Sequence, residues 1–253
     1  MSHGHGRKRS LVLTRERIEA NHGGPPPPEG RATPRLDEAA IDRRLAQAIA
    51  RVDGEGCWLF AYGSLMWRPD FPVAGRRVAT VHGYHRRFCL WQWRHRGSDA
   101  APNLMLALDA GGSCSGVAYR VAPPGLREKL TPVWRRELMG NGYQARWVTA
   151  ATDQGPVRAA AFVVNRGGGR YAGHLADEQV ADTIARARGH SGTGAEYLLD
   201  AAAALEDMGL SDAMLWRMQR LVAERLAAAG RGPPRAGHVI ARGNRRRNHS
   251  ATR

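Results

Sequence analysis

Residues 57–67 read CWLFAYGSLMW, and this stretch is the strongest local structural signal in the chain. Six apolar or aromatic residues at 57–62 are followed directly by Gly63 and Ser64. A short apolar run cut off by a glycine is typical of a buried strand that enters a tight turn. Such a turn can direct successive backbone N–H groups into one concavity, where they bind an anion. Because turns of this kind are also common as plain structural elements, the stretch alone leaves the role of the turn open.

Further strands are expected downstream of this first one. Residues 78–93 mix β-branched and aromatic residues around Gly83, which predicts a long strand with a bend or bulge. Shorter strands separated by glycine-rich turns are expected at 104–108, 116–121, 144–149 and 157–164.

Helical patterns are found mainly in the second half of the chain. Apolar residues at helical spacing predict an amphipathic helix at 37–52, and Pro132 should kink or divide a helix at 124–138. Clearer helices are expected at 177–188, 195–208 and 212–229. Strands that come first and helices that mostly follow favour an α+β fold over an alternating parallel sheet.

The net charge of +15 resides mostly at the two ends of the 253-residue chain. Residues 1–35 hold seven basic and three acidic residues, and residues 231–253 hold seven basic residues and no acidic one. Residues 21–30, NHGGPPPPEG, are typical of a linker. We therefore predict a disordered basic segment with a Pro-rich linker at 1–35, one catalytic domain at 36–230 and a disordered basic tail at 231–253. Trimming both ends should change activity by only a few-fold.

Composition also excludes several classes of protein. Cys57, Cys89 and Cys114 lie too far apart for a zinc knuckle or a redox pair and are expected to be small buried residues in a reducing compartment. No apolar stretch is long enough to span a membrane, and the basic N-terminus lacks the apolar region of a secretory signal. A soluble cytoplasmic protein is expected.

A second stretch, WRRELMGNGY at 134–143, places Glu137 near a helix end beside Arg135 and Arg136. Taken alone, this is an ordinary surface ion pair that contributes about 0.5 kcal/mol. A carboxylate at this end of a helix is disfavoured by the helix dipole, which points to a purpose other than helix stability.

Taken together, the two stretches resemble the ChaC γ-glutamylcyclotransferases. The resemblance extends over roughly residues 56–225 and includes GYHRRF at 83–88, RGS at 96–98, GGSCSGVA at 111–118, and a Ser-Gly turn at 191–192 that leads to EYL at 196–198. The triplet Gly140-Asn141-Gly142 departs from the pattern, because some relatives are more compact there. The resemblance implies a compact mixed β-barrel with flanking helices.

The implied activity is glutathione-specific: the γ-glutamyl group is cyclised to 5-oxoproline and cysteinylglycine is released. The family's catalytic glutamate corresponds to Glu137, and a tyrosine near the substrate corresponds to Tyr143. The substrate-binding loop corresponds to Ala61, Tyr62, Gly63, Ser64, Leu65 and Met66. No cofactor or metal is expected, because the substrate's own α-amine is the nucleophile and no histidine lies at metal-ligand spacing from a carboxylate.

This chemistry sets two expectations for the site. A carboxylate that takes a proton from an α-ammonium works best with its pKa raised towards about 6–7, so Arg135 and Arg136 should point away from Glu137. The substrate's glycyl carboxylate needs a cation, and the candidates are Arg86, Arg87, Arg94 and Arg96.

Two alternatives remain open. One is a cyclotransferase for other γ-glutamyl amines or amino acids, because the residues that recognise the far half of the substrate are not identifiable from sequence. The other is a nucleic-acid-binding protein, suggested by Arg245-Arg246-Arg247 and the net charge. Since no nucleic-acid-binding motif accompanies that charge, nucleic acid is expected to make only weak contacts with the tails. The oligomeric state is left open.

Overall fold

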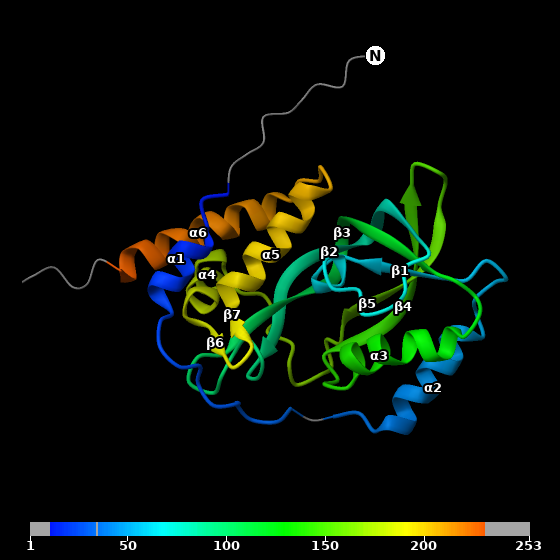
Figure 1. The fold of residues 1–253 in the computed structure, drawn as a ribbon, viewed down its shortest axis with the longest axis horizontal. Coiled ribbons are helices and arrows are strands. Elements are labelled where there is room, and N and C mark those ends of the chain that lie inside the picture. Colours follow the sequence, from blue (N-terminus) through cyan, green and yellow to red (C-terminus); the bar gives the residue numbers. More distant parts are fainter. Residues whose placement is uncertain (1–10, 34, 231–253) are drawn as a thin grey trace, which may run out of the picture.

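A closed five-stranded barrel forms the centre of the protein in the computed structural model, which describes residues 11–33 and 35–230 (Figure 1). Its strands are β1 (Cys57–Ala61), β2 (Gly75–Gln92), β3 (Asn103–Val121), β4 (Tyr143–Thr152) and β5 (Val157–Val164). They are ordered β1-β3-β2-β4-β5, and β5 closes the barrel by pairing in parallel with β1. The predicted α+β barrel with flanking helices is confirmed.

Strands β2 and β3 form a long antiparallel pair that is irregular at the glycine expected from sequence. The register shifts between His82 and Tyr84, around Gly83, whose φ of 85° is a conformation that glycine adopts readily. Strand β3 is continuous where two separate strands were predicted. Gly111 and Gly112 do not end it, because β2 pairs with β3 on both sides of them.

The helices gather in two groups around the barrel (Figure 1). One group packs beside the ends of β2 and β3 and consists of α1 (Arg15–Asn21), α4 (Asp177–Arg186), α5 (Gly194–Asp207) and α6 (Ala213–Ala229). The other is the pair α2 (Glu38–Ile49) and α3 (Leu126–Leu138), with α3 also against β4. A short 3₁₀ helix, η1 (Ser64–Met66), and a two-stranded pair, β6 (Arg188–Gly189) and β7 (Gly192–Thr193), complete the fold.

Helix α3 is not divided at Pro132, so of the two predicted outcomes, a kink or a division, the division does not occur. It runs unbroken from Leu126 to Leu138 with the proline inside it. Pro132 lies on the exposed side of the helix, while Leu130, Val133 and Trp134 are buried. The carbonyl that loses its partner at a proline can be hydrated on an exposed face, so packing of the opposite face holds the helix together.

Strand β1 is buried on both faces because it separates two apolar clusters. Trp58 and Phe60 belong to a cluster that contains residues from all five barrel strands and none from a helix. Cys57, Leu59 and Ala61 belong to a larger cluster that joins the barrel to the helices. This alternation fits the period of two of a strand, and the unbroken apolar run in the sequence reflects burial on both faces.

The segment before α2 differs from the disorder predicted for residues 1–35. Residues 11–33 and 35–36, here called the N-terminal arm, contain α1 and connect it to α2 (Figure 1). Leu13 and Ile18 are fully buried in the main core, and Leu36 N–H donates to the Met139 carbonyl at the end of α3 (2.9 Å). The prediction is therefore wrong for 11–33, because buried apolar side chains and polar contacts to the rest of the fold hold this segment in place. Residues 1–10 and the predicted tail at 231–253 lie outside the described residues.

All three cysteines are buried and free, as predicted. Burial raises the pKa of the Cys57 and Cys89 thiols to about 12 and that of Cys114 to about 11. They are therefore inert protonated thiols at neutral pH. Within the described ranges, no helix is long and apolar enough to cross a membrane.

Candidate active site

A cleft of about 720 Å³ lies where the end of α3, the η1 turn, the loop between β2 and β3, and the N-terminal arm meet. Its charged lining consists of seven arginines and three acidic residues, which are Arg35, Arg68, Arg94, Arg96, Arg135, Arg136, Arg170, Glu29, Asp70 and Glu137. A second, small pocket of about 20 Å³ shares Ser64, Glu137, Tyr143 and Tyr197 with the cleft. The small pocket has room for a group of the size of one water molecule or carboxylate.

The turn after β1 forms one wall of the small pocket. The Met66 N–H donates to the Gly63 carbonyl (2.8 Å), and the Arg68 N–H donates to the Ser64 carbonyl (2.8 Å). These bonds close η1 and leave the N–H groups of Ser64 and Leu65, at its start, without a carbonyl partner inside the turn. Arg86 fixes the strand end by donating from Nε to the Tyr62 carbonyl (2.6 Å).

The reason for a glycine at position 63 is its neighbour rather than its backbone conformation. Gly63 has φ −136°, which other residues also adopt. A Cβ at this position would lie 3.2 Å from the Tyr197 hydroxyl oxygen, which is tight for such a contact. A larger side chain would therefore press on Tyr197 and fill the small pocket.

The loop residues predicted to bind substrate occupy two different environments. Gly63, Ser64 and Leu65 line the small pocket together with Tyr62, and Ser64 also lines the cleft. The Tyr62 hydroxyl donates to the Phe162 carbonyl (2.5 Å), so this side chain is tied to the barrel. Ala61 and Met66 are buried, at 1% and 6% exposure, and line neither cavity.

Glu137 lies in the last turn of α3 with its side chain 12% exposed, at the wall shared by the cleft and the small pocket. Burial raises its pKa above the ordinary glutamate value, and the nearby Asp70 adds to this. Arg136 and Arg170 act in the opposite direction, but burial is the larger cause. The expected direction of the shift is therefore found.

The two arginines before Glu137 behave differently, and the prediction that both point away from it is wrong for one. Arg135 does point away and pairs with Glu38 of α2 (2.9 Å). Arg136 Nε lies 3.2 Å from Glu137 Oε1, and its Nη2 donates to Ser64 Oγ (2.6 Å). Arg136 also pairs with Asp70, which draws part of its charge away from Glu137. Arg136 thus links the carboxylate to the turn.

Two tyrosines complete the small pocket. Tyr143, at the start of β4, donates its hydroxyl to the Leu106 carbonyl (2.8 Å) and lines both cavities, as Glu137 does. Tyr197, on α5, is 3% exposed and packs its ring against Trp67 and Phe88. Burial raises the pKa of both hydroxyls, so both are protonated hydrogen-bond donors.

The four arginines proposed for the glycyl carboxylate are all paired with acidic side chains. Arg86 pairs with Asp212, and Arg87 pairs with Asp109 (3.1 Å); neither lines the cleft. Arg94 does line the cleft, where it pairs with Glu29 of the N-terminal arm.

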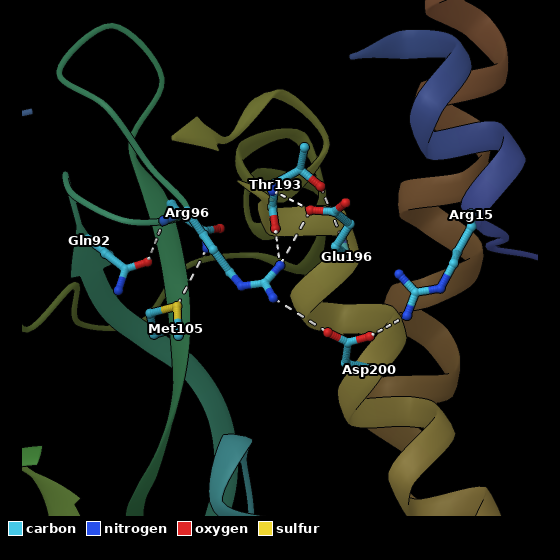
Figure 2. Close-up of polar contacts among 8 residues, drawn as sticks. Arg15, Gln92, Arg96, Met105, Thr193, Glu196 and Asp200 are labelled. Atoms are coloured by element: carbon cyan, nitrogen blue, oxygen red, sulfur yellow. Dashed lines mark hydrogen bonds and ion pairs between the residues drawn. The ribbon is translucent and has the colours of Figure 1, made fainter. Parts of the chain in front are cut away.

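Arg96 also lines the cleft and belongs to a network that ends in the arm (Figure 2). Its guanidinium donates to the Thr193 carbonyl (3.2 Å) and reaches Glu196 (3.4 Å) and Asp200 (3.5 Å) of α5. Asp200 also pairs with Arg15 of α1 (3.0 Å). The network fixes Arg96 and leaves its charge compensated by two carboxylates.

Sequence reasoning missed several residues that line the cleft. Tyr197 was quoted as part of a motif but was not assigned to the site, and only its approach to Gly63 in space reveals its place. Arg170, in the loop after β5, had no local signal at all. Glu29 and Thr33 of the arm were expected to be disordered but line the cleft. In the described part of the chain, no cluster of three or more histidine, cysteine or acidic residues could hold a metal ion.

Comparison with known proteins agrees with this architecture. The family model described as ChaC-like protein matches residues 57–225. A glutathione-specific γ-glutamylcyclotransferase of Escherichia coli is 36% identical over 187 residues, which cover 71% of this chain and 80% of that protein. The human glutathione-specific γ-glutamylcyclotransferase 1 is 40% identical over 153 residues, which cover 58% and 68%.

A crystal structure of a yeast γ-glutamylcyclotransferase specific to glutathione has the same fold, with a TM-score of 0.63 at 21% identity. The match covers 67% of this chain and 96% of the yeast chain. The family match extends from the first residue of β1 into α6, so it contains the barrel, the η1 turn and Glu137. This chain belongs to the ChaC-like protein family.

Proposed function

We propose that this protein is a glutathione-specific γ-glutamylcyclotransferase that acts in glutathione catabolism. It converts glutathione into 5-oxoproline and cysteinylglycine without a cofactor or metal. The observation that carries the proposal is the position of Glu137. A carboxylate with a raised pKa lies at the wall of a small pocket, opposite a turn that has unpaired backbone N–H groups. The family membership and the names of the two relatives support the same activity.

The first requirement of the reaction is a bent γ-glutamyl group. The α-amine must approach the γ-carbonyl carbon to close a five-membered ring, and good orientation contributes roughly 7–11 kcal/mol to such a step. The N–H groups of Ser64 and Leu65 can donate hydrogen bonds to the α-carboxylate in the small pocket, and the Ser64 hydroxyl can add a third donor. Arg136 holds Ser64 Oγ from the other side, so the hydroxyl proton is free to point to the substrate.

The second requirement is proton transfer, which Glu137 performs in two steps. Its carboxylate first takes a proton from the α-ammonium, and the neutral amine then attacks the γ-carbonyl carbon. The C–N bond to cysteine breaks as Glu137 returns the proton to the departing nitrogen. The second proton of the ring nitrogen then passes to the released amine, which leaves the neutral lactam of 5-oxoproline. Burial raises the pKa of Glu137 towards that of the amine, which brings the two proton affinities closer. Tyr143 and Tyr197 remain neutral and help to exclude water.

The charge of the cleft matches a substrate with two carboxylates. Seven arginines against three acidic residues give the lining an excess of positive charge, which attracts an anionic peptide. A purely apolar or cationic γ-glutamyl amine would gain less from this lining. This favours glutathione over the alternative of other γ-glutamyl amines.

The decisive experiment is incubation of the purified protein with glutathione, followed by mass spectrometry for 5-oxoproline and cysteinylglycine in equal amounts. γ-Glutamyl amino acids without glycine are run in parallel. If 5-oxoproline forms from the γ-glutamyl amino acids but not from glutathione, the substrate assignment is wrong. If it forms from neither, the proposal is refuted.

We also propose that the protein acts in the cytoplasm, which is consistent with three free buried cysteines. The alternative function, nucleic-acid binding, rests on charge at the two ends of the chain rather than on the cleft. We expect it to be weak and salt-dependent.

A further inference from the structure

We infer that Arg170 is the specificity residue that binds the carboxylate at the far end of the peptide substrate, the glycyl carboxylate of glutathione. This inference rests on the proposed function and deepens it. The relevant feature is a cation in the cleft that, unlike most of its neighbours, has no carboxylate partner.

The pairing of the cleft arginines identifies Arg170. Four of the seven are paired with acidic side chains: Arg94, Arg96, Arg135 and Arg136. In the described ranges 11–33 and 35–230, the other three make no ion pair, and these are Arg35, Arg68 and Arg170. Arg35 and Arg68 are exposed, whereas Arg170 is partly buried. An unpaired, partly buried guanidinium carries a desolvation cost that an incoming anion would relieve.

Arg170 is also held rigidly in position before any ligand arrives. Its Nε donates to the Trp91 carbonyl (2.8 Å), and its own carbonyl accepts from the Trp91 N–H (2.8 Å). These two bonds attach the loop after β5 to the end of β2. The remaining guanidinium donors, on Nη1 and Nη2, are therefore available at little entropic cost to a carboxylate.

The two glycines of the Gly140-Asn141-Gly142 triplet make room for this guanidinium. A Cβ at Gly140 would lie 2.6 Å from Arg170 Nη1, and one at Gly142 would lie 3.0 Å from the same atom. Glycine at these two positions thus lets the side chain extend over the end of α3, beside Glu137.

The two cavities determine which carboxylate Arg170 would meet. Arg170 lines the cleft but not the small pocket, whereas Ser64 and Leu65 line the small pocket. If the α-carboxylate occupies the small pocket, the carboxylate that reaches Arg170 belongs to the part of the ligand lying in the cleft. In glutathione that group is the glycyl carboxylate, at the opposite end from the reacting amine.

The test compares glutathione with its C-terminal amide, which differs only in lacking the glycyl charge. Dissociation constants are measured by calorimetry in the Glu137→Gln background, where bound substrate is not consumed. With Arg170 present, glutathione should bind about 10- to 100-fold more tightly than the amide, as expected for a hydrogen-bonded charge. Arg170→Met should reduce this ratio to within about threefold of unity, and Arg170→Lys should retain part of it.

Two further variants separate charge recognition from general damage. Gly140→Ala should displace the guanidinium without removing it and so lower the same ratio, because its φ is not in the positive range that strains alanine. Arg127→Met removes an exposed arginine of α3 that lines neither cavity and should leave the ratio unchanged. If Arg170→Met weakens the binding of glutathione and of its amide equally, Arg170 contacts the α-carboxylate or only supports the structure of the cleft. That result would overturn the inference. A ratio that Arg170→Met leaves unchanged would overturn the inference as well. So would a failure of the Glu137→Gln protein with Arg170 intact to bind glutathione.

The proposed function is tested separately by turnover in the unaltered protein. If 5-oxoproline forms but the ratio does not depend on Arg170, the inference fails and the function stands. If no 5-oxoproline forms but the ratio depends on Arg170, the site recognises the peptide and the function fails.

Discussion

The N-terminal arm and the barrel region that carries Glu137 contribute to the same cleft by different means. The barrel region supplies a buried carboxylate and a turn with free N–H groups, and the family match covers it. The arm lies before the matched residues, contains Leu13 and Ile18 in the core, and lines the cleft with Glu29 and Thr33. The residues proposed to carry out the reaction and the residues that close one side of the cleft therefore come from different segments of this chain. Changes in the first should affect rate, and changes in the second should affect mainly stability.

The largest effect is expected for Glu137→Gln in the barrel region. Loss of the single acid/base group should lower kcat by about 10²–10⁴-fold, or roughly 3–5 kcal/mol of barrier, without unfolding the protein. Production of 5-oxoproline and the melting temperature are measured together. Glu128→Gln, an exposed glutamate on the same helix, is the control and should be fully active. A Glu137→Gln protein with more than a third of normal kcat would remove this residue from the mechanism.

The arm should show the opposite behaviour in Leu13→Ala. Leu13 is fully buried in the main core, and truncating such a side chain costs about 2–5 kcal/mol of unfolding free energy. Activity per folded molecule should be retained, because Leu13 does not line the cleft. The measurement is denaturant unfolding followed by kcat below the transition.

The neighbouring residue provides a matched control for the arm. Val12 and Leu13 both donate their N–H to Gln219 Oε1 (3.0 Å each), but Val12 is 41% exposed. Val12→Ala should change the unfolding free energy by no more than about 0.5 kcal/mol. Equal and small effects of both substitutions would mean that the arm is not part of the folded core. The same burial predicts that trimming to residue 35 destabilises the protein, which is a separate effect from the few-fold change in activity expected from sequence.

A smaller effect is expected for Ser64→Ala at the turn. It removes one hydrogen bond to a charged group, which costs about 1.5–3 kcal/mol in kcat/KM, and the backbone N–H groups remain. The change should appear in steady-state kinetics with glutathione, with no loss of melting temperature. Ser113→Ala, an exposed serine on β3, is the control. An unchanged kcat/KM in Ser64→Ala would mean that the hydroxyl does not contact the substrate and only accepts the hydrogen bond from Arg136.

The sequence predicts the barrel region better than the arm for physical reasons. The apolar run at 57–62 is buried on both faces, so its composition alone is enough to predict a buried strand. In the arm, a few apolar side chains among proline, glycine and charged residues give no periodic signal, and only docking in three dimensions reveals the burial of Leu13 and Ile18. The same limit applies to Arg135 and Arg136. Neighbouring residues on a helix point about 100° apart, and sequence cannot say which of the two contacts Glu137.

The last and smallest effect separates those two arginines by pH. In the proposed mechanism Glu137 must be ionised before it accepts the α-ammonium proton, so kcat/KM should fall as pH drops through the pKa of Glu137. Burial raises that pKa, and Arg136 partly offsets the rise. Arg136→Met removes the offset and also leaves Asp70 without its partner, and both changes raise the pKa further.

The acid limb of the kcat/KM profile should therefore move to higher pH in Arg136→Met. Arg135→Met should leave the limb in place, because Arg135 pairs with Glu38 on the far side and both side chains are about half exposed. That exposed pair contributes less than about 1 kcal/mol, so stability should hardly change either. A limb that moves to lower pH in Arg136→Met, or moves equally in both variants, would show that the contact between Arg136 and Glu137 does not set the ionisation of the catalytic carboxylate.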